Sequence, residues 1–492
     1  MNLAIYIFLL FCLITGCSDF NIISSLCDVF IRLIFLIISI LFISYSIIKK
    51  FDIFINFSTL WFAFQRYIGL ILCNYSFISI NTFKNFFLLK DIFFIYSFFI
   101  LLILFLMRKI KKVKLPLLET DKFLILYCIL LLLYTLFSTT NIWLRLLSLR
   151  RFIILPLVYF IGRMAIINFN KIISCLKYTI IFTYVICIYG LIDYFFARTY
   201  IYQHLFNVYD YFNKQVLAGF IPIQWLGDDV MRGGIFIDYT FGEFPRFITT
   251  FIEPTTLGSF LAFVLLFAVF QKDIIKIKPI WIKHILNMML FLSILLTFSK
   301  GAFTILLFGS AFILNYNKRI PKIIRSGYFY SVIAVFGIGI TLILLSASGA
   351  SAHINGLKTG LMSAITHPLG LGLGNAGNFA NLLGDNNTES IGGESAIGSM
   401  LGQLGFVGFT PYLLFVIFLI KTLSKKIQNS SLFIVIAGAF LGYSVNSMFT
   451  DSALGVTGNF YYFLFAGLFV SQAILFEKKG YKYHEKSFIH NS

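Results

Sequence analysis

Charged side chains are scarce in this sequence. Only 12% of the 492 residues are Asp, Glu, Lys or Arg, about half the usual share for a soluble globular chain. Hydrophobic residues make up 59%, and the mean hydropathy is +0.91. A soluble fold of this size would leave far too much apolar surface in water. The composition therefore excludes a soluble enzyme, a disordered chain and a soluble nucleic-acid binder, and it predicts a polytopic membrane protein.

Cysteine is absent from the C-terminal half of the chain. The seven cysteines lie between Cys12 and Cys187, mostly inside apolar runs and without a metal-type spacing, so they are interpreted as small apolar residues. Lys and Arg are absent from the first residues, Met1 to Tyr6, so the apolar stretch that follows lacks the basic start of a signal peptide. We expect that stretch to be retained as a membrane helix. No cofactor and no metal site is predicted.

Apolar runs of about twenty residues mark helices that cross a bilayer. The sequence predicts an all-α polytopic membrane protein with about fourteen transmembrane helices and two long extracytoplasmic loops. The predicted spans are roughly 3–17, 29–48, 53–72, 91–107, 123–138, 152–167, 172–196, 248–271, 284–299, 301–316, 328–346, 398–420, 431–449 and 458–476. The corresponding regions are N-terminal helices (1–196), a first large loop (197–247), central helices (248–346), a second large loop (347–397), and C-terminal helices with a tail (398–492).

The distribution of Lys and Arg predicts the orientation of the chain. Alternating spans place 26 of the 39 basic residues on one face, which carries a balance of +20, while the rest of the chain carries −1. Basic loops stay in the cytoplasm, so this face and both termini are predicted to be cytoplasmic. The net charge of +19 is then explained by topology without a nucleic-acid partner. Both long loops fall on the outer face, where function is expected.

The charges that lie outside this cytoplasmic set are the candidate functional residues. A charged residue within a span costs about 2.5–3.5 kcal/mol on insertion scales, so it persists where it faces a partner or a cavity. A solvated loop side chain remains the alternative for each loop residue. The candidates at span edges and in the loops are Arg145, Arg150, Arg151, Arg232, Arg246, Glu253, Lys300, His353, Lys358, His367 and Glu394.

A glycine-rich stretch follows His367. Gly372, Gly374 and Gly377 form a G-x-G-x-x-G pattern, but no strand or βαβ unit surrounds it, so a nucleotide site is not expected. We expect a flexible turn whose backbone can approach a ligand. Gly398 and Gly402, four residues apart, predict close packing between helices.

Four segments together resemble a known family. Arg246 to Gly258 (RFITTFIEPTTLG), Leu296 to Ala302 (LTFSKGA), Pro368 to Gly372 (PLGLG), and Glu394-Ser395 followed by Leu404 to Gly408 (LGFVG) resemble, in order and spacing, motifs of O-antigen polymerases and ligases. Two positions depart from the pattern: Lys300 replaces the usual Arg, and Glu394 stands where ligases typically carry His. The second departure favours a Wzy-type polymerase.

The resemblance implies a GT-C type, metal-independent and inverting glycosyltransferase of lipopolysaccharide biosynthesis in the bacterial inner membrane, although a retaining mechanism stays open. Its substrate would be an undecaprenyl-pyrophosphate-linked oligosaccharide, and a chain-length regulator is a further candidate partner. Arg246 and Lys300 are expected to bind the pyrophosphate, with Glu253 and the cations Arg145, Arg150, Arg151, Arg232 and Lys358 as additional binding candidates. Glu394 is the expected general base, with His353 and His367 as alternatives.

Two other functions stay open on the sequence. One is a ligase, which moves a finished glycan onto lipid A-core. Ligases have the same motifs, except that they typically carry a His where this chain has Glu394. A flippase or other transporter usually carries ionisable residues inside its spans and often an internal repeat. Here no repeat is found, and Arg66 is the main charge inside a span, with Arg32 and Asp193 as lesser ones.

Overall fold

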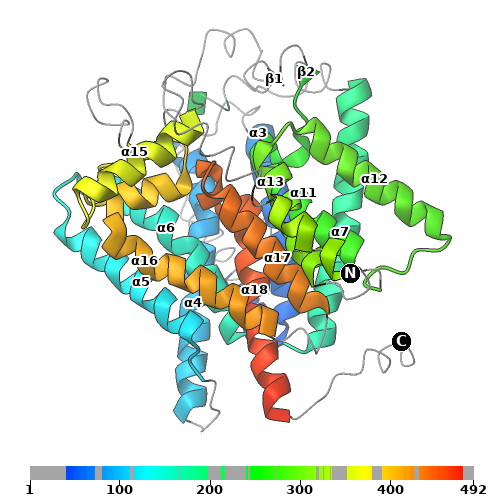
Figure 1. Ribbon diagram of the computed structural model, residues 1–492, viewed down its shortest axis with the longest axis horizontal. Helices are drawn as coiled ribbons and strands as arrows, with labels where there is room; N and C mark the ends of the chain where they lie inside the picture. Colours follow the sequence, from blue (N-terminus) through cyan, green and yellow to red (C-terminus); the bar gives the residue numbers. More distant parts are fainter. Residues whose placement is uncertain are drawn as a thin grey trace, which may run out of the picture. The chain divides into compact units, whose positions relative to one another are not determined.

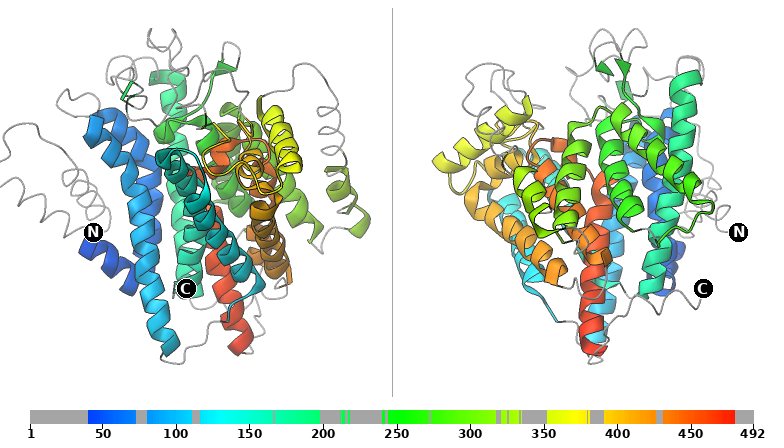
Figure 2. Two further views of the ribbon diagram at one scale, coloured as in Figure 1. Left: turned by 90° about the vertical axis from the view of Figure 1, so that its left-hand side faces the viewer. Right: turned by 45° about the vertical axis from the view of Figure 1, so that its right-hand side comes forward.

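The computed structural model describes residues 40–72, 80–110, 116–165, 167–197, 211, 213–214, 217, 240–241, 244–271, 273–316, 321–324, 326–332, 334, 352–378, 380, 391–425 and 431–479. These residues are predominantly helical (Figures 1 and 2). Two short strands, β1 (Thr240–Phe241) and β2 (Phe244–Pro245), pair antiparallel. The predicted span 3–17, most of 29–48, the central part of the first loop and Arg232 lie outside the described residues.

The chain divides into two compact units. Unit 1 comprises Met1–Leu104, Ala165–Leu257 and Ile277–Phe298, and unit 2 comprises Phe105–Met164, Gly258–Lys276 and Ser299–Ser492. The helices of unit 1 are α3 (Phe51–Leu72), most of α4 (Ile80–Ile110), α7 (Phe169–Ile192), η1 (Asp193–Ala197), η4 (Thr249–Phe251) and α12 (Ile280–Leu296). The helices of unit 2 are α5 (Glu119–Phe137), α6 (Ile142–Met164), most of α11 (Pro254–Phe270), α13 (Lys300–Asn315), α15 (Ala352–Thr366), α16 (Ala396–Lys425), α17 (Ser431–Asn446), η6 (Asp451–Leu454) and α18 (Val456–Lys479).

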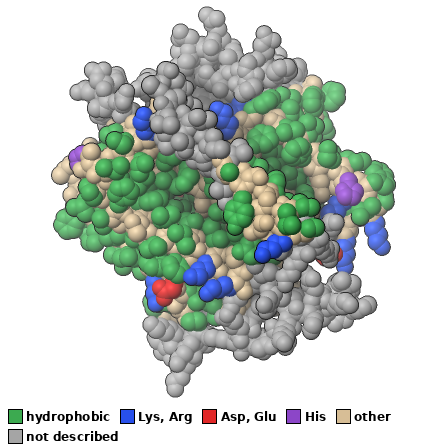
Figure 3. All heavy atoms as spheres, in the orientation of Figure 1, with side chains coloured by type: hydrophobic (Ala, Val, Ile, Leu, Met, Phe, Trp, Pro, Cys, Tyr) green, Lys and Arg blue, Asp and Glu red, His purple; other side chains and the backbone are tan. Residues whose placement is uncertain are grey.

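Four helices are long and apolar enough to cross a membrane. They are α5, α7 with its π-helical extension to Phe196, α16, and α18 as far as Leu475. Six shorter apolar helices accompany them among the described residues. On the face drawn in Figure 3, hydrophobic side chains predominate among the described residues. These features fit a helical membrane protein, whereas the number of fourteen spans stays a prediction.

Two helices differ from the sequence prediction. Helix α6 begins at Ile142, ten residues before the predicted span 152–167. The apolar window excluded this first part because it carries three arginines, yet Arg and Leu both favour helix, so the charged residues continue the same helix. The second predicted loop contains α15, a helix of 15 residues, and is therefore not an irregular loop throughout.

Small residues bring the helices of unit 2 close together. A Cβ on Gly162 of α6 would overlap the Leu464 carbonyl of α18, and one on Gly309 of α13 would press on the Leu266 side chain of α11 and the Gly438 carbonyl of α17. Gly398 of α16 lies directly against α15, where a Cβ would overlap the Gly356 carbonyl. Glycine at such contacts permits close backbone approach between membrane helices. The predicted packing role of Gly398 is confirmed.

Polar side chains join the helices of unit 1. The Tyr67 hydroxyl on α3 hydrogen-bonds the Tyr189 hydroxyl on α7 at 2.8 Å. The Tyr184 hydroxyl on α7 donates to Asn287 Oδ1 on α12 at 2.6 Å. Within apolar helices such groups require partners, because an unpaired polar group in hydrocarbon is costly.

Candidate functional site

The first two family-like segments contact each other in unit 1. The Arg246 guanidinium donates from Nε to the Thr297 carbonyl at 2.7 Å and from Nη2 to the Phe298 carbonyl at 3.5 Å. The Phe247 amide donates to the Leu296 carbonyl at 2.8 Å. These carbonyls belong to the C-terminal end of α12, where helices leave carbonyls unsatisfied and where a cation is favourable. Arg246 therefore holds the turn that leads into Lys300.

A strained turn precedes α11. Thr249 and Ile252 both have positive φ, 47° and 58°, around the short helix η4. Such conformations cost about 1–3 kcal/mol each for non-glycine residues and persist where the surrounding structure holds them. The side chains of Thr249 and Ile252 are buried, and η4 packs against both α3 and α7. The turn places Glu253 immediately before the first residue of α11.

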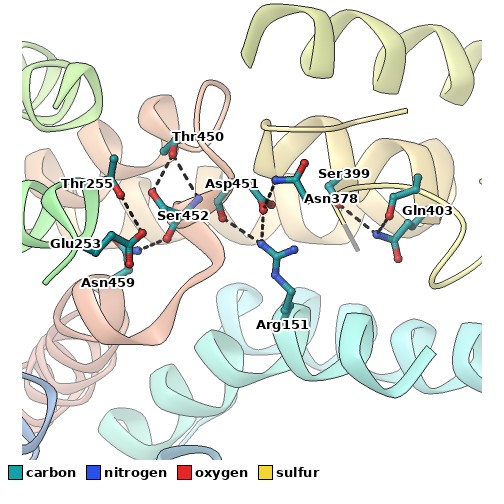
Figure 4. Close-up of polar contacts among 11 residues, drawn as sticks. Arg151, Glu253, Thr255, Asn378, Ser399, Gln403, Thr450, Asp451, Ser452 and Asn459 are labelled. Carbon is teal, nitrogen blue, oxygen red and sulfur yellow. Dashed lines mark hydrogen bonds and ion pairs between the residues drawn. The ribbon is translucent and has the colours of Figure 1, made fainter. Parts of the chain in front are cut away.

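Glu253 forms an ion pair with Arg66 of α3. The side chains of Arg66 and Glu253 are 28% and 20% exposed. The Thr255 hydroxyl also donates to Glu253 Oε1, at 3.0 Å (Figure 4). In the sequence, Arg66 is a charge inside a span and Glu253 is a binding candidate, but no local pattern pairs them. The pair explains how Arg66 is accommodated in an apolar helix, because a buried charge needs an opposite partner.

The third and fourth family-like segments contact each other in unit 2. Helix α16 contains a kink at Gly405, which has φ 59° and ψ −167°. In a regular helix the Val407 amide would donate to the Gln403 carbonyl, four residues back. Here it donates to the Pro368 carbonyl at 3.3 Å. In return, the Gly372 amide donates to the Gln403 carbonyl at 3.0 Å, and the Leu371 amide donates to the Gly402 carbonyl at 2.9 Å. The glycine-rich segment thus replaces hydrogen bonds that the kinked helix lacks.

Gln403 fixes the rest of this segment. Its buried amide accepts from the Gly374 amide at 2.9 Å and donates to the Ala376 carbonyl at 2.7 Å and to Ser399 Oγ at 3.1 Å (Figure 4). From α5, the Tyr134 hydroxyl donates to the Leu369 carbonyl at 2.6 Å. The expectation of a flexible turn is therefore wrong. Its glycines have positive φ because the backbone follows α16 closely.

A charged cluster of unit 2 joins three segments that lie far apart in the sequence. Arg151 Nη2 donates to Asp451 Oδ2 at 2.5 Å, and Asn378 Nδ2 donates to the same oxygen at 3.0 Å. Figure 4 shows the three side chains pointing toward one another. Arg151 belongs to α6, Asn378 follows the glycine-rich segment, and Asp451 begins η6. We call Arg151, Asn378 and Asp451 the α6–η6 cluster.

The turn that carries Asp451 is rigidly built. Thr450 Oγ1 accepts from the Ser452 amide at 3.3 Å, and Asn459 Nδ2 donates to the Ser452 carbonyl at 3.0 Å. Asp451 Oδ1 is buried and has no hydrogen-bond partner within the described part of the chain. A carboxylate oxygen held in this way has lone pairs that can accept a hydroxyl proton.

The first turns of α6 concentrate positive charge. Arg145, Arg150 and Arg151 all lie within the first ten residues of this helix. Arg145 Nη1 donates to the Thr135 carbonyl of α5 at 3.0 Å. Cations at a helix N-terminus oppose the macrodipole, which favours anions there. This end of α6 is therefore suited to an anion, and Asp451 supplies one.

The other candidates differ in exposure. Lys300 is the first residue of α13 and is exposed, while Ser299 caps the helix by accepting from the Ala302 amide at 3.3 Å. Lys358 on α15 and His367 directly after it are also exposed, and His367 Nδ1 hydrogen-bonds Thr366 Oγ1 at 2.9 Å. Glu394 is half-buried in the turn before α16. His353 lies on α15, but its side chain is outside the described residues, and Arg232 is outside them altogether.

Asp451 and Asn378 are not among the site residues expected from the sequence. A signal for Asp451 was present, because it is the sole acidic residue in the sequence between Glu394 and Glu477 and lies between two apolar runs. Asn378 offered no such signal, since a loop asparagine is ordinary.

Comparison of the chain with protein-family models and with curated proteins finds no match.

Proposed function

We propose that this protein is a glycosyltransferase that polymerises lipid-linked oligosaccharide units. It would transfer the growing glycan from undecaprenyl pyrophosphate to the next lipid-linked unit, on the outer face of the bacterial inner membrane. The observation that carries the proposal is that the four family-like segments are coupled in pairs. Arg246 holds the turn ending in Phe298, and the Pro368–Gly372 segment completes the hydrogen bonds of kinked α16.

Departure of the lipid pyrophosphate develops negative charge, and cations aimed at it lower the barrier. Lys300 is suited to this role, because it is exposed and begins a helix whose N-terminal dipole also attracts anions. The α6 arginines are further candidates. Glu253 is better suited to position Arg66, since a carboxylate paired with a guanidinium stays charged and would repel a phosphate.

The acceptor sugar must lose a hydroxyl proton as it attacks, so a carboxylate is expected beside it. Glu394 remains the proposed base. It lies in the turn Ile391–Glu394, which precedes α16, and the Gly377 amide donates to the Ile391 carbonyl of this turn at 2.7 Å. Asp451 is a second candidate, because it is a carboxylate whose Oδ2 is held by Arg151 and Asn378 and whose Oδ1 has no hydrogen-bond partner among the described residues.

The contacts also support the predicted sidedness. Arg151, Asn378 and Asp451 lie in three segments that the Lys and Arg distribution assigns to one face, and they meet in one cluster. At the opposite end of α6, Arg163 pairs with Asp121 in the first turn of α5 at 3.2 Å. Which face is the outer one rests on the positive-inside rule.

The test is complementation of a deletion strain, followed by gel analysis of its surface polysaccharide. Lys300→Ala is expected to stop chain extension and leave a core bearing one unit, whereas Lys300→Arg should restore the ladder, because it keeps the cation. Lys177→Ala is the matched control, since Lys177 is exposed on α7 and assigned to the cytoplasmic face.

The deletion phenotype separates the candidate functions. A bare core with accumulated lipid-linked chains would mean a ligase, and accumulated unflipped single units would mean a flippase. A normal ladder with Lys300→Ala would contradict the role of Lys300 in phosphate binding.

A further inference from the structure

An open groove of about 410 Å³ lies between the C-terminal turns of α13 and α16 in unit 2. Its apolar wall consists of Phe312, Ile417 and Ile420. Its polar rim consists of Tyr316, Lys421, Ser424 and Lys425. Helix α17 packs against both α13 and α16, so the two sides of the groove belong to one packed assembly. The volume falls in the range of cavities that hold small ligands.

The groove changes character along α16. Ile417, Lys421 and Lys425 follow one another at intervals of four residues and therefore lie on one face of the helix. The apolar residue comes first and the two lysines follow, one and two turns further along. Phe312 of α13 and Tyr316, the residue directly after this helix, repeat this order, with ring centroids 4.9 Å apart. Both walls thus run from an apolar part to a hydrogen-bonding or charged part.

The two charged residues that line the groove are both lysines. Lys421 and Lys425 are exposed. In the sequence, neither 316–326 nor 417–430 contains an Asp or Glu. A rim of this composition attracts an anion and offers no carboxylate to an ammonium group.

These features match one ligand chemistry. We propose that the groove binds an anionic phospholipid, whose phosphate lies between Lys421 and Lys425 and whose acyl chain covers Phe312, Ile417 and Ile420. The hydroxyl of Tyr316 can donate a hydrogen bond to the headgroup, whereas the Ser424 hydroxyl donates to the Ile420 carbonyl of its own helix at 2.6 Å. Basic sites between membrane helices are suited to phosphate headgroups of this kind.

This site is separate from the proposed active site. Lys421 lies sixteen residues beyond Gly405 on α16, which is about 24 Å along a helix at 1.5 Å per residue. That is most of the thickness of the hydrocarbon core, about 30 Å. The groove belongs to the end of α16 that the basic residues assign to the cytoplasm, so the inference does not depend on the proposed transferase activity.

The experiment is native mass spectrometry of the purified full-length protein in detergent, titrated with phosphatidylglycerol or phosphatidylethanolamine. The wild type is expected to retain phosphatidylglycerol in preference to phosphatidylethanolamine. Lys421→Gln/Lys425→Gln should weaken phosphatidylglycerol retention by about thirtyfold, the worth of two lysine contacts. Lys276→Gln/Lys278→Gln removes the same charge from exposed positions elsewhere and should leave retention unchanged.

A second variant tests the apolar part of the groove. Ile420→Trp should lower phosphatidylglycerol retention by narrowing the groove while both lysines remain. Inorganic phosphate in millimolar excess should not displace the lipid. Equal retention of both lipids, undiminished phosphatidylglycerol retention by the double lysine variant, or displacement by phosphate would overturn the proposal. Each variant should unfold at the same temperature as the wild type, which would show that the loss of lipid binding does not result from a loss of fold.

Discussion

Asp451→Asn is the most informative single substitution in unit 2. It keeps the shape of the side chain and removes its charge. Asp451 Oδ2 accepts from Arg151 Nη2 at 2.5 Å and from Asn378 Nδ2 at 3.0 Å. The side chains of Arg151 and Asp451 are only 16% and 14% exposed. The substitution therefore leaves a guanidinium in a poorly hydrated place without its counter-charge.

The expected cost follows from this burial. Removing one partner of a fully buried ion pair costs about 3–5 kcal/mol. Residual solvent access, and the amide oxygen that still accepts one hydrogen bond, lower this to about 2–3 kcal/mol. At about 2.1 cal/mol/K per residue, the unfolding entropy of the 492 residues is about 1 kcal/mol/K, so the unfolding temperature should fall by roughly 2–3 °C. The measurement is thermal unfolding of the detergent-purified protein, followed by tryptophan fluorescence.

A double-mutant cycle decides whether the pair itself carries this effect. Arg151→Gln should destabilise by a similar amount, because it leaves the carboxylate unpaired. The double variant Arg151→Gln/Asp451→Asn should lose far less than the sum, with a coupling of about 1.5–3 kcal/mol. Lys358→Gln, an exposed site in the same unit, is the control and should not shift the transition. Additive single effects, with a coupling below about 0.5 kcal/mol, would refute the α6–η6 cluster as an interacting unit.

Three further predictions address the base, the kink and the orientation. Glu394→Gln should lower chain extension by about 10²–10⁴, the usual contribution of a positioned base, as measured by polymer length on gels; near-normal polymer would move the role to Asp451. Gly405→Ala should lower the free energy of unfolding by about 1–3 kcal/mol or more, because φ is 59° and a Cβ would overlap the Pro368 carbonyl. Gly327→Ala is the control and should be tolerated, because no atom lies near the added Cβ. Equal unfolding temperatures of the two variants would contradict the kink. Reporter fusions near Gln224 and Asn381, both outside the described residues, should report the outer compartment, and a cytoplasmic signal at either site would reverse the orientation.

The sequence by itself determined where most of the helices lie. Apolar runs are local, and a segment rich in Leu, Ile and Phe forms a buried or lipid-facing helix wherever it is placed. The predicted spans 53–72 and 458–476 therefore overlap α3 (Phe51–Leu72) and α18 (Val456–Lys479) closely. Gly398 was also correctly interpreted, because small residues spaced by four serve helix contacts in many membrane proteins.

Only the tertiary structure decided which charges and which backbone groups meet. Arg151 and Asp451 are 300 residues apart, and no local pattern links them. Arg66 was identifiable as a charge inside an apolar span, but its partner Glu253 is supplied by a strained turn. No local pattern indicated the positive φ angles of this turn, at Thr249 and Ile252.

The glycine-rich segment was expected to be flexible because glycine frees the backbone. It is fixed instead, because the kink at Gly405 exposes the carbonyls of Gly402 and Gln403 and the amides of Leu371 and Gly372 bind them. Hydrophobicity is a property of each residue and can be read directly from the sequence. Ion pairs and hydrogen bonds between distant segments form only once folding has brought those segments together.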